Sequence, residues 1–196
     1  MTDDTIPVPR GHVATIVTYL EMLAPPELKP FSSSVLKLKR WQEASCDSYR
    51  KLFREIGTDW LWIGRLLMSD DALQAVLNDA DIHRYAVKAS DDRACGMVEL
   101  DFRMSSECEI VYLGLTPDYA GKGHGEWLIS QTLKLAWRND VKRVWLHTCT
   151  LDHPAALSFY CKHGFVPFKR EIETLPDPRL TGHLQRDAAP QIPIIE

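Results

Sequence analysis

EIVYLGLTPDYAGKGHGEW, residues 109–127, joins an apolar run to a glycine-rich loop and then to the start of a helical pattern. Gly121, Gly123 and Gly125 leave successive backbone N–H groups free of side chains. Such a loop can surround an anion, and the positive N-terminal end of the following helix strengthens the attraction. The alternative is a connector that binds nothing, although glycines this close together cost conformational entropy. We therefore interpret the loop as an anion site.

The spacing of the loop excludes two other kinds of phosphate site. A P-loop requires Ser or Thr after its lysine, whereas Lys122 is followed by Gly123. A dinucleotide loop, G-x-G-x-x-G, would end on Glu126 or Leu128, neither of which is glycine. The loop also lies in the middle of the chain after an apparent hairpin, which disagrees with a doubly wound sheet.

The residues before the loop predict three strands. Runs at 83–89 and 94–103 flank a polar turn and form a hairpin. The run at 107–115 is apolar on both faces at its centre, which is typical of a central strand. In the second strand, alternation places Met97, Glu99 and Asp101 on one face.

The residues after the loop predict two further helix–strand pairs. The helices are expected at 122–138 and 153–164, and the strands at 142–150 and 165–173. Pro154 at the first position and Gly164 just past the end support the second helix.

The N-terminal part predicts one strand and two helices. The strand covers 13–23, and the proline-rich segment 24–34 then breaks regular structure. Ser45 or Asp47 caps a helix that runs through Ile56 and is ended by Gly57. Asp70 caps a second helix, whose apolar side contains Leu73, Val76 and Leu77.

One mixed α/β domain over residues 1–196 is the simplest account of this order of elements. Residues 1–11 are expected to form a loose arm, and residues 176–196, with four prolines, a mostly irregular tail.

The composition of the 196 residues narrows the function classes. A net charge of −4 argues against a nucleic-acid partner held by bulk positive charge. The five cysteines form no CxxC pair, so we predict no zinc or other metal site and no disulfide framework. The N-terminus does not resemble a signal peptide, and no apolar run approaches the ~20 residues of a membrane span. The expectation is a cytoplasmic protein without a membrane or nucleic-acid partner.

Three pieces of the sequence, in order, resemble the GNAT superfamily of acyl-CoA-dependent N-acetyltransferases. EIVYLGLTPDYAGKGHG resembles its central strand and pyrophosphate loop, usually Q/R-x-x-G-x-G/A, and RVWLHTCT matches the strand that follows. DHPAALSFYCKHGF resembles its later helix, which bears a tyrosine and closes with Gly-Phe. The resemblance covers about residues 83–170.

The resemblance implies a mostly antiparallel mixed sheet with splayed central strands, flanked by helices. It also implies acetyl-CoA as co-substrate, with pantetheine on the first strand and pyrophosphate on the loop. The residues expected to bind it are Leu113, Gly114, Leu115, Ala120, Gly121, Lys122, Gly123, His124, Gly125 and His153. Ala120 replaces the usual Arg or Gln and His153 a common Asn, but neither change removes the backbone amides of the loop.

Two carboxylates are candidates for the base that deprotonates an amine. Glu109 begins the central strand and, by alternation, lies on the side of Val111 and Leu113. Its placement resembles the catalytic glutamate of the histone-acetyltransferase branch. Glu99 is the second candidate. For either residue the alternative is a solvated strand residue, or water removing the proton.

Tyr160 is the candidate acid, because it shares a helix face with Ala156 and matches the thiolate-protonating tyrosine of the family. The alternative is a core tyrosine with a bonded hydroxyl. His147 lies within a strand among apolar residues, so we predict a structural role. Cys149 and Cys161 lack a thiolate-activating context, which argues against a cysteine acyl intermediate.

Trp60, Trp62 and Arg65 are predicted to pack in the core, with a substrate-binding wall as the alternative. The resulting hypothesis is transfer of an acetyl group from acetyl-CoA to a primary amine of a small molecule or peptide, by direct attack. A non-catalytic acyl-CoA sensor and transfer of a different acyl group stay open. The protein is expected to be capable of forming a homodimer.

Overall fold

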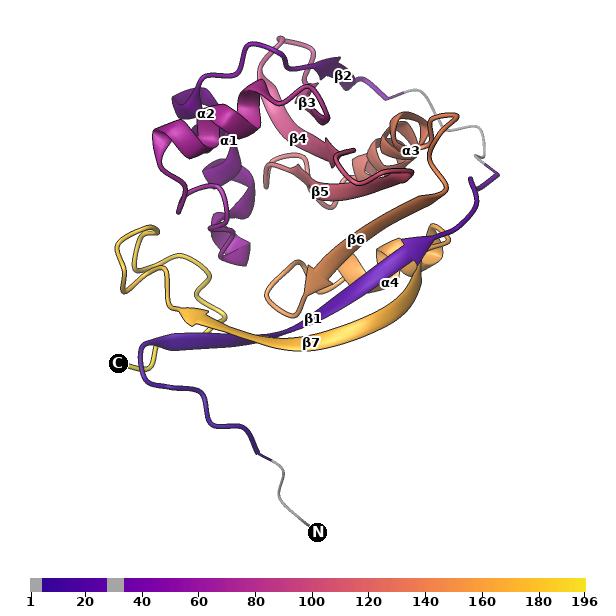
Figure 1. The fold of residues 1–196 in the computed structure, drawn as a ribbon. Helices are drawn as coiled ribbons and strands as arrows, with labels where there is room; N and C mark the ends of the chain where they lie inside the picture. Colours follow the sequence, from indigo (N-terminus) through magenta and orange to yellow (C-terminus); the bar gives the residue numbers. More distant parts are fainter. Residues whose placement is uncertain (1–4, 28–33) are drawn as a thin grey trace.

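The computed structural model describes residues 5–27 and 34–196 (Figure 1). Residues 1–4 of the expected arm and 28–33 of the proline-rich segment lie outside the described residues. The elements are β1 (His12–Met22), β2 (Lys37–Arg40), α1 (Cys46–Gly57), η1 (Thr58–Trp60), α2 (Asp70–Asn78), β3 (Ile82–Lys88), β4 (Ala94–Asp101), β5 (Glu107–Leu115), α3 (His124–Ala136), β6 (Arg143–Cys149), α4 (Ala156–Lys162) and β7 (Val166–Pro176).

The strands form one seven-stranded sheet in the order β2-β3-β4-β5-β6-β1-β7. Every pair is antiparallel except β5–β6, which is parallel. That pair covers only Glu107–Glu109 opposite Arg143–Trp145, and the two strands then diverge, as Figure 1 shows. The mixed, mostly antiparallel sheet with splayed central strands is therefore confirmed.

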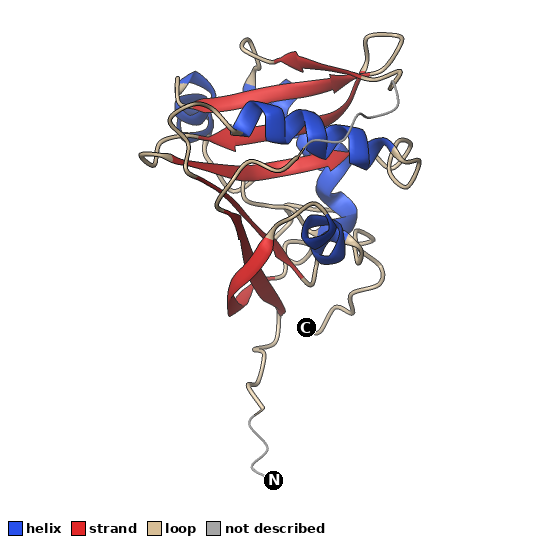
Figure 2. Ribbon diagram, turned by 90° about the vertical axis from the view of Figure 1, so that its right-hand side faces the viewer, coloured by secondary structure: helices blue, strands red, loops and turns tan. Residues whose placement is uncertain are grey.

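Two hydrophobic clusters cover opposite faces of the sheet. The first lies under α3 and includes Val98, Leu100 and Phe102 of the β4 region. The second lies under α1 and α2 and includes Met97. Figures 1 and 2 show helices on both sides of the strands. The predicted alternation along β4 is thus confirmed, with Met97 and Glu99 on the α1 face.

A β-bulge in β5 changes which side chains share a face. Tyr112 lies opposite Glu99 and Ile110 opposite Leu100, so Val111 is the extra residue. Leu113 consequently packs with the cluster under α3, and Tyr112 with the one under α1. Glu109 therefore shares its face with Tyr112, and our prediction that it shares one with Leu113 was wrong. The extra residue reverses the alternation in the middle of the strand.

Serine side chains cap the starts of α1 and α2. Ser45 accepts the N–H of Ser48 at 3.2 Å, which confirms it as the cap of α1. Ser69, and not Asp70, caps α2 by accepting the N–H of Ala72. Asp70 is instead the first helical residue, where its charge favours the positive end of the helix.

Three element predictions needed correction. The edge strand β2 was missed, because its sequence KLKR is short and mostly charged. α4 begins at Ala156 and not Pro154, after a turn. β7 continues to Pro176, because β1 supplies a partner along its whole length.

The C-terminal tail contains no helix or strand but is packed against the domain. Leu184, Ala188 and Ala189 are buried in the cluster under α1. Arg179 is buried and donates to Asp177 at 2.7 Å and to the carbonyl of Ile192 at 2.8 Å. Irregular backbone is therefore held in place here by a buried ion pair.

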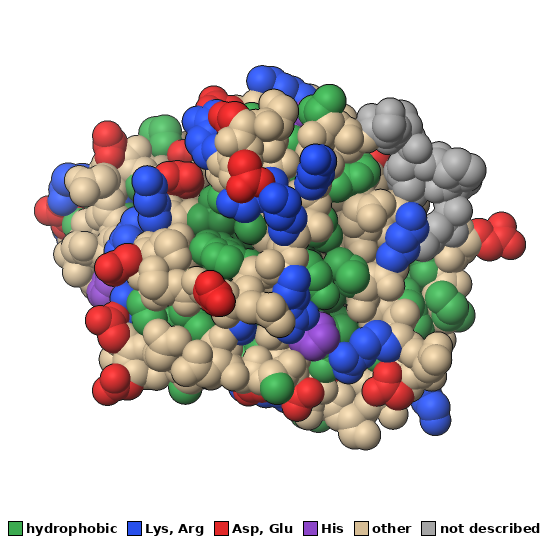
Figure 3. All heavy atoms as spheres, turned by 90° about the horizontal axis from the view of Figure 1, so that it is seen from above, with side chains coloured by type: hydrophobic (Ala, Val, Ile, Leu, Met, Phe, Trp, Pro, Cys, Tyr) green, Lys and Arg blue, Asp and Glu red, His purple; other side chains and the backbone are tan. Residues whose placement is uncertain are grey.

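One face of the molecule carries charges of both signs. Seen from above, Lys and Arg side chains lie beside Asp and Glu side chains over the same face (Figure 3). Within residues 5–27 and 34–196, no helix has the length and apolar character needed to span a bilayer.

Candidate active site

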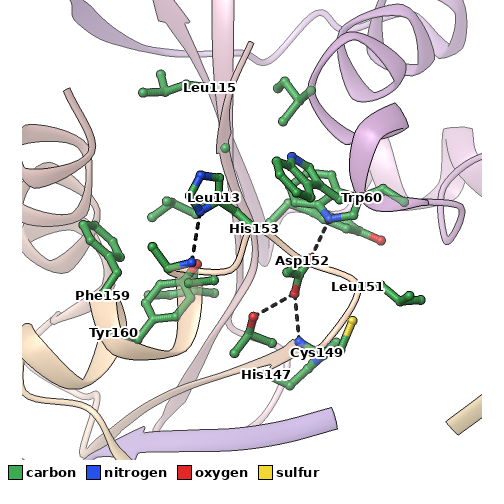
Figure 4. Close-up of a pocket in the computed structure, with 18 of the residues that line it drawn as sticks. Trp60, Leu113, Leu115, His147, Cys149, Leu151, Asp152, His153, Phe159 and Tyr160 are labelled. Carbon is green, nitrogen blue, oxygen red and sulfur yellow. Dashed lines mark hydrogen bonds between the residues drawn. The ribbon is translucent and has the colours of Figure 1, made fainter. Parts of the chain in front are cut away.

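A cavity of about 600 Å³ opens where β5 and β6 diverge. Its wall includes the glycine loop, the second half of β5, the end of β6, the segment 60–64 at and after the end of η1, and α4. Figure 4 shows Phe159 and Tyr160 on one side of the cavity and Trp60 and Leu151 on the other. Residues distant in sequence thus surround one space of a size typical of small-molecule sites.

The glycine loop presents its backbone to this cavity. Gly121 and Gly123 have φ angles of +70° and +81°, which residues with a side chain rarely adopt, and they line the cavity with Ala120 and Gly125. Lys122 and His124 are not part of the cavity wall. The loop therefore borders the cavity with its glycines, and these two side chains lie outside the wall.

Helix α3 begins directly after this turn. Its N-cap is Gly123, which offers no side-chain hydrogen bond, so the first N–H groups of the helix have no cap. Free amides at a helix N-terminus next to a left-handed turn form a site for an anion such as a phosphate. The loop residues thus fit a pyrophosphate through the backbone alone, and Ala120 does not prevent this.

The edge of β5 is open along the cavity. Leu113, Gly114 and Leu115 line the cavity beyond the last pairing with β6, so main-chain groups on this edge are not used by the sheet. A Cβ built on Gly114 would lie 2.5 Å from Ile56 and 3.1 Å from Trp62. Close packing on the α1 face therefore requires this glycine, whether or not a ligand approaches its backbone.

Tyr160 reaches the cavity from α4. Its ring packs edge-on against Phe159 and Phe165, with centroids 5.6 and 5.9 Å away. The hydroxyl has no hydrogen-bond partner among residues 5–27 and 34–196. Burial, followed by the nearby carboxylate of Asp152, raises the pKa of Tyr160, so the hydroxyl keeps its proton.

Glu109 is the last β5 residue that pairs with β6, and it lies at the base of the splay. Its side chain is 22% exposed. Burial, followed by the charge of Asp101, raises the pKa of Glu109 to about 7, although Arg65 and Arg103 oppose the shift. A carboxylate of this pKa can accept a proton near neutrality.

A family model described as "Acetyltransferase (GNAT) family" matches residues 39–165. The chain belongs to this family. The matched region contains β3 to β6, the glycine loop and α4, and so it contains most of the cavity wall.

Solved structures share the fold of this GNAT chain. One is a GCN5-related N-acetyltransferase from Sphaerobacter thermophilus, with a TM-score of 0.61, 11% identity and coverage of 86% of this chain and 52% of that one. Another is a functionally unknown conserved protein from Staphylococcus epidermidis, with a TM-score of 0.55 and 15% identity. The match covers 85% of this chain and 63% of that one. The chain therefore spans less than two thirds of either relative.

A spermidine N-acetyltransferase from Vibrio cholerae, described as dodecameric, gives a TM-score of 0.55 at 16% identity and covers 79% of this chain and 99% of that one. At such identities the likeness concerns the fold alone. A comparison with curated protein sequences finds no match.

Glu99 of this GNAT chain is fully buried on the α1 face. One carboxylate oxygen accepts the hydroxyl of Tyr49 at 2.6 Å, and the other forms an ion pair with Arg65. Both oxygens are therefore occupied inside the core. This geometry favours a structural role for Glu99 and leaves Glu109 as the better candidate base.

His147 corrects another expectation about the GNAT site. We predicted a structural histidine among apolar residues, but the side chain is 47% exposed and lines the cavity. Its Nε2 lies 3.9 Å from Oε1 of Glu109. The apolar neighbours in sequence point to the other face of β6 and pack under α3.

Asp152 is a site residue that sequence reasoning missed. It accepts hydrogen bonds from Nε1 of Trp62 at 2.9 Å, from the hydroxyl of Thr148 at 2.7 Å and from the N–H of Cys149 at 2.9 Å (Figure 4). The carboxylate thus ties the segment after η1 to the end of β6, across the cavity. An aspartate two residues before Pro154 was the available signal, since such residues often accept nearby backbone N–H groups.

The aromatic segment after α1 divides between packing and the cavity. Arg65 pairs with Glu99 in the core, whereas Trp62 packs with Phe53 and Tyr112 and also lines the cavity. Trp60 lines the cavity and meets the ring of His153 at 5.1 Å.

The cysteines add nothing to the site chemistry. Burial and the charge of Asp152 raise the pKa of Cys149, which opposes a reactive thiolate. Among the described residues, no group of three or more His, Cys, Asp or Glu side chains is arranged to hold a metal ion.

Proposed function

We propose that this chain transfers an acetyl group from acetyl-CoA to a primary amine by direct attack. One observation carries the proposal: a single cavity joins an anion-binding backbone loop, an open strand edge and a tyrosine hydroxyl. A phosphate-bearing thioester needs these three features in this order along its length. Family membership supports the same chemistry.

The residues present fit the pyrophosphate and pantetheine parts of acetyl-CoA. The amides of Gly121, Gly123 and the first turn of α3 would hold the pyrophosphate. The free edge of β5 at Leu113–Leu115 would pair with the amide groups of pantetheine. Trp60 and His153, whose rings meet at 5.1 Å, would form another part of the wall around the bound molecule.

A thioester bound in the splay would lie near Tyr160, with Glu109 at the base of the splay behind the cavity wall. As the amine attacks, a C–N bond forms and the C–S bond breaks, so the departing thiolate needs a proton. Tyr160 keeps its proton at neutral pH because burial raises its pKa, and its hydroxyl has no competing partner among the described residues. A free N–H on the edge of β5 would stabilise the negative charge on the carbonyl oxygen.

The amine itself must lose a proton before it attacks. Glu109 has the carboxylate whose pKa, about 7, suits this task, whereas Glu99 is occupied by Tyr49 and Arg65. We therefore propose that Glu109 accepts the amine proton before it passes to solvent. The acceptor is proposed as a small molecule or a peptide amine.

Two further parts of the proposal concern a cytoplasmic location and a homodimer. All five cysteines are unpaired, which fits the reducing cytoplasm. β7 exposes Val166 and Ile172 by 63% and 57% on a strand at the sheet edge, which fits association with a second copy as a homodimer.

Calorimetry with acetyl-CoA, followed by free-thiol release over a panel of amines, tests the proposal. We expect binding below millimolar concentration and amine-dependent thiol release. Binding without release on any amine would favour a non-catalytic acyl-CoA sensor. Release only with longer thioesters would identify another acyl group, and absence of binding would overturn the proposal.

A further inference from the structure

His147 stands between the cavity and Glu109. It lines the cavity, whereas Glu109 is not part of the wall. In Figure 4, His147 lies at the lower edge of the cavity on β6, next to Cys149. Its exposed fraction of 47% compares with 22% for Glu109. A substrate in the cavity would therefore meet the imidazole before the carboxylate.

The register of the sheet brings the two side chains together. Glu109 lies opposite Trp145, and His147 follows two residues later on the same face of β6, just beyond the last paired rung. Nε2 of His147 lies 3.9 Å from Oε1 of Glu109. This separation is longer than a hydrogen bond, and contacts between catalytic groups often tighten when substrate binds.

The side chains around the His147 imidazole pack against its ring and leave its nitrogens available for proton transfer. The ring lies 5.7 Å from the ring of Tyr19 on β1, which is itself covered by Lys169 of β7. Within the described part of the chain, neither ring nitrogen makes a hydrogen bond. The charged groups that face Glu109 are Glu99 and Asp101 from β4, Arg65 after η1 and Arg103 after β4.

We propose that His147 is a catalytic residue that takes the proton of the acceptor amine in the cavity and passes it to Glu109. The inference rests on the proposed function and extends it to a second proton-transfer group. An imidazole suits this place because it has two nitrogens and exchanges protons near neutral pH.

In this step the neutral imidazole takes one proton from the acceptor ammonium, and the free amine attacks the thioester carbon. The C–N bond forms, the C–S bond breaks, and Tyr160 protonates the thiolate. The imidazolium passes its proton to Glu109 and from there to solvent. The second amine proton leaves as the amide forms, and solvent reprotonates Tyr160, so one proton is released per turnover.

The first test measures the coupling of the two groups without any substrate. In ¹H–¹⁵N NMR spectra at pH 8, the ring resonances of His147 should move in Glu109→Gln, because the charge of the carboxylate, 3.9 Å away, acts on the imidazole. Glu107→Gln is the matched control on the same face of β5, where the carboxylate pairs with Arg143 instead, and it should leave these resonances nearly unchanged. Ring resonances in Glu109→Gln that match those of the wild type would overturn the coupling.

The second test uses an amine accepted by the wild type. His147→Gln should lower kcat/KM for the amine about 10²-fold and leave the KM for acetyl-CoA unchanged. Added imidazole should restore part of the rate of His147→Ala, which a merely structural histidine would not allow. His12→Gln, on the remote end of β1, is the control. The double variant Glu109→Gln/His147→Gln should be no slower than the slower single variant.

The outcomes separate this inference from the proposed function. Wild-type kcat/KM in His147→Gln, or no rescue by imidazole, overturns the role of His147 while acetyl transfer stands. If the wild type binds acetyl-CoA but acetylates no amine, the proposed function and the transfer through His147 both fall.

Discussion

At the scale of single residues, chemistry at the base of the splay depends on how each carboxylate is neutralised. Glu99 and Glu109 lie on the same face of the sheet, on neighbouring strands. Glu99 is fully buried but has two strong partners, whereas Glu109 is partly buried beside Asp101 and His147. The first arrangement stabilises an anion, and the second holds a carboxyl group ready to exchange a proton.

Glu109→Gln should lower the activity but raise the stability of the folded state at high pH. We expect kcat/KM to fall about 10²-fold and to lose its rise with pH near 7. Because the pKa is raised from 4.5 to about 7, the folded state is favoured at low pH, and this stability is lost as pH rises through 7. Gln does not ionise, so at pH 8 the variant should be more stable by up to about 3 kcal/mol.

Denaturant unfolding at pH 4 and pH 8 measures that difference. The gain should be confined to the higher pH, since Glu109 is protonated in both states at the lower one. Glu107→Gln should show no such gain, because it removes a carboxylate that pairs with Arg143. Equal gains for the two variants would contradict the burial argument.

Tyr160→Phe should lower kcat about 10²-fold and leave the affinity for acetyl-CoA nearly unchanged, because it removes only the proton donor. Thiol release and calorimetry measure the two quantities. Tyr85→Phe, on β3 away from the cavity, is the control. Unchanged kcat in Tyr160→Phe would assign the hydroxyl no role in protonation.

At the scale of elements, the junction between β5 and α3 is the part of the site made from backbone alone. A strand edge without a partner, a left-handed turn and an uncapped helix follow one another in the chain. Side chains at Lys122 and His124 are not required for this geometry, since neither lines the cavity.

Gly123→Ala tests this backbone site. Its φ of +81° costs a residue with a Cβ about 1–2 kcal/mol, and relaxation would turn amides away from the anion. We expect the KM for acetyl-CoA to rise several-fold. Gly182→Ala is matched in strain, with a φ of +79° and open space around the added Cβ, but it lies in the tail. It should lower stability similarly without changing this KM, and parallel effects on KM would argue against the loop.

At the scale of the whole molecule, the tail closes the domain beneath α1. Asp177 accepts from Arg179 and donates its N–H to the carbonyl of Gly11, and Gly11 donates to Ile195. Leu184, Ala188 and Ala189 of the tail are buried in the same cluster as α1 and α2. The cluster that positions Trp62 and Tyr112 beside the cavity therefore depends partly on the last residues of the chain.

Arg179→Ala leaves Asp177 buried without its partner and should destabilise the fold by about 3–5 kcal/mol. Hydrogen exchange should rise first in residues 177–196 and then in α1. Arg186→Ala removes an exposed pair with Glu196 and should have little effect. Equal effects of the two substitutions would show that burial of the pair is unimportant.

The sequence by itself determined the glycine loop and the order of the helices and strands around it, from β3 to β7. Periodicity predicted the hairpin before the loop and the helix after it, and the spacing of Gly121 and Gly123 distinguished the loop from other phosphate sites. These features are local, because hydrophobic alternation, caps and left-handed turns depend on residues close together in the chain.

The tertiary structure alone decided which side chains meet. The bulge at Val111 moved Glu109 to the face of Tyr112, and divergence of β6 from β5 exposed His147 beside it. Asp152 gained its role only when Trp62, distant in sequence, packed above it. Register, burial and charge are set by contacts between strands and helices far apart in the chain, so they follow from the packed sheet and not from any local pattern.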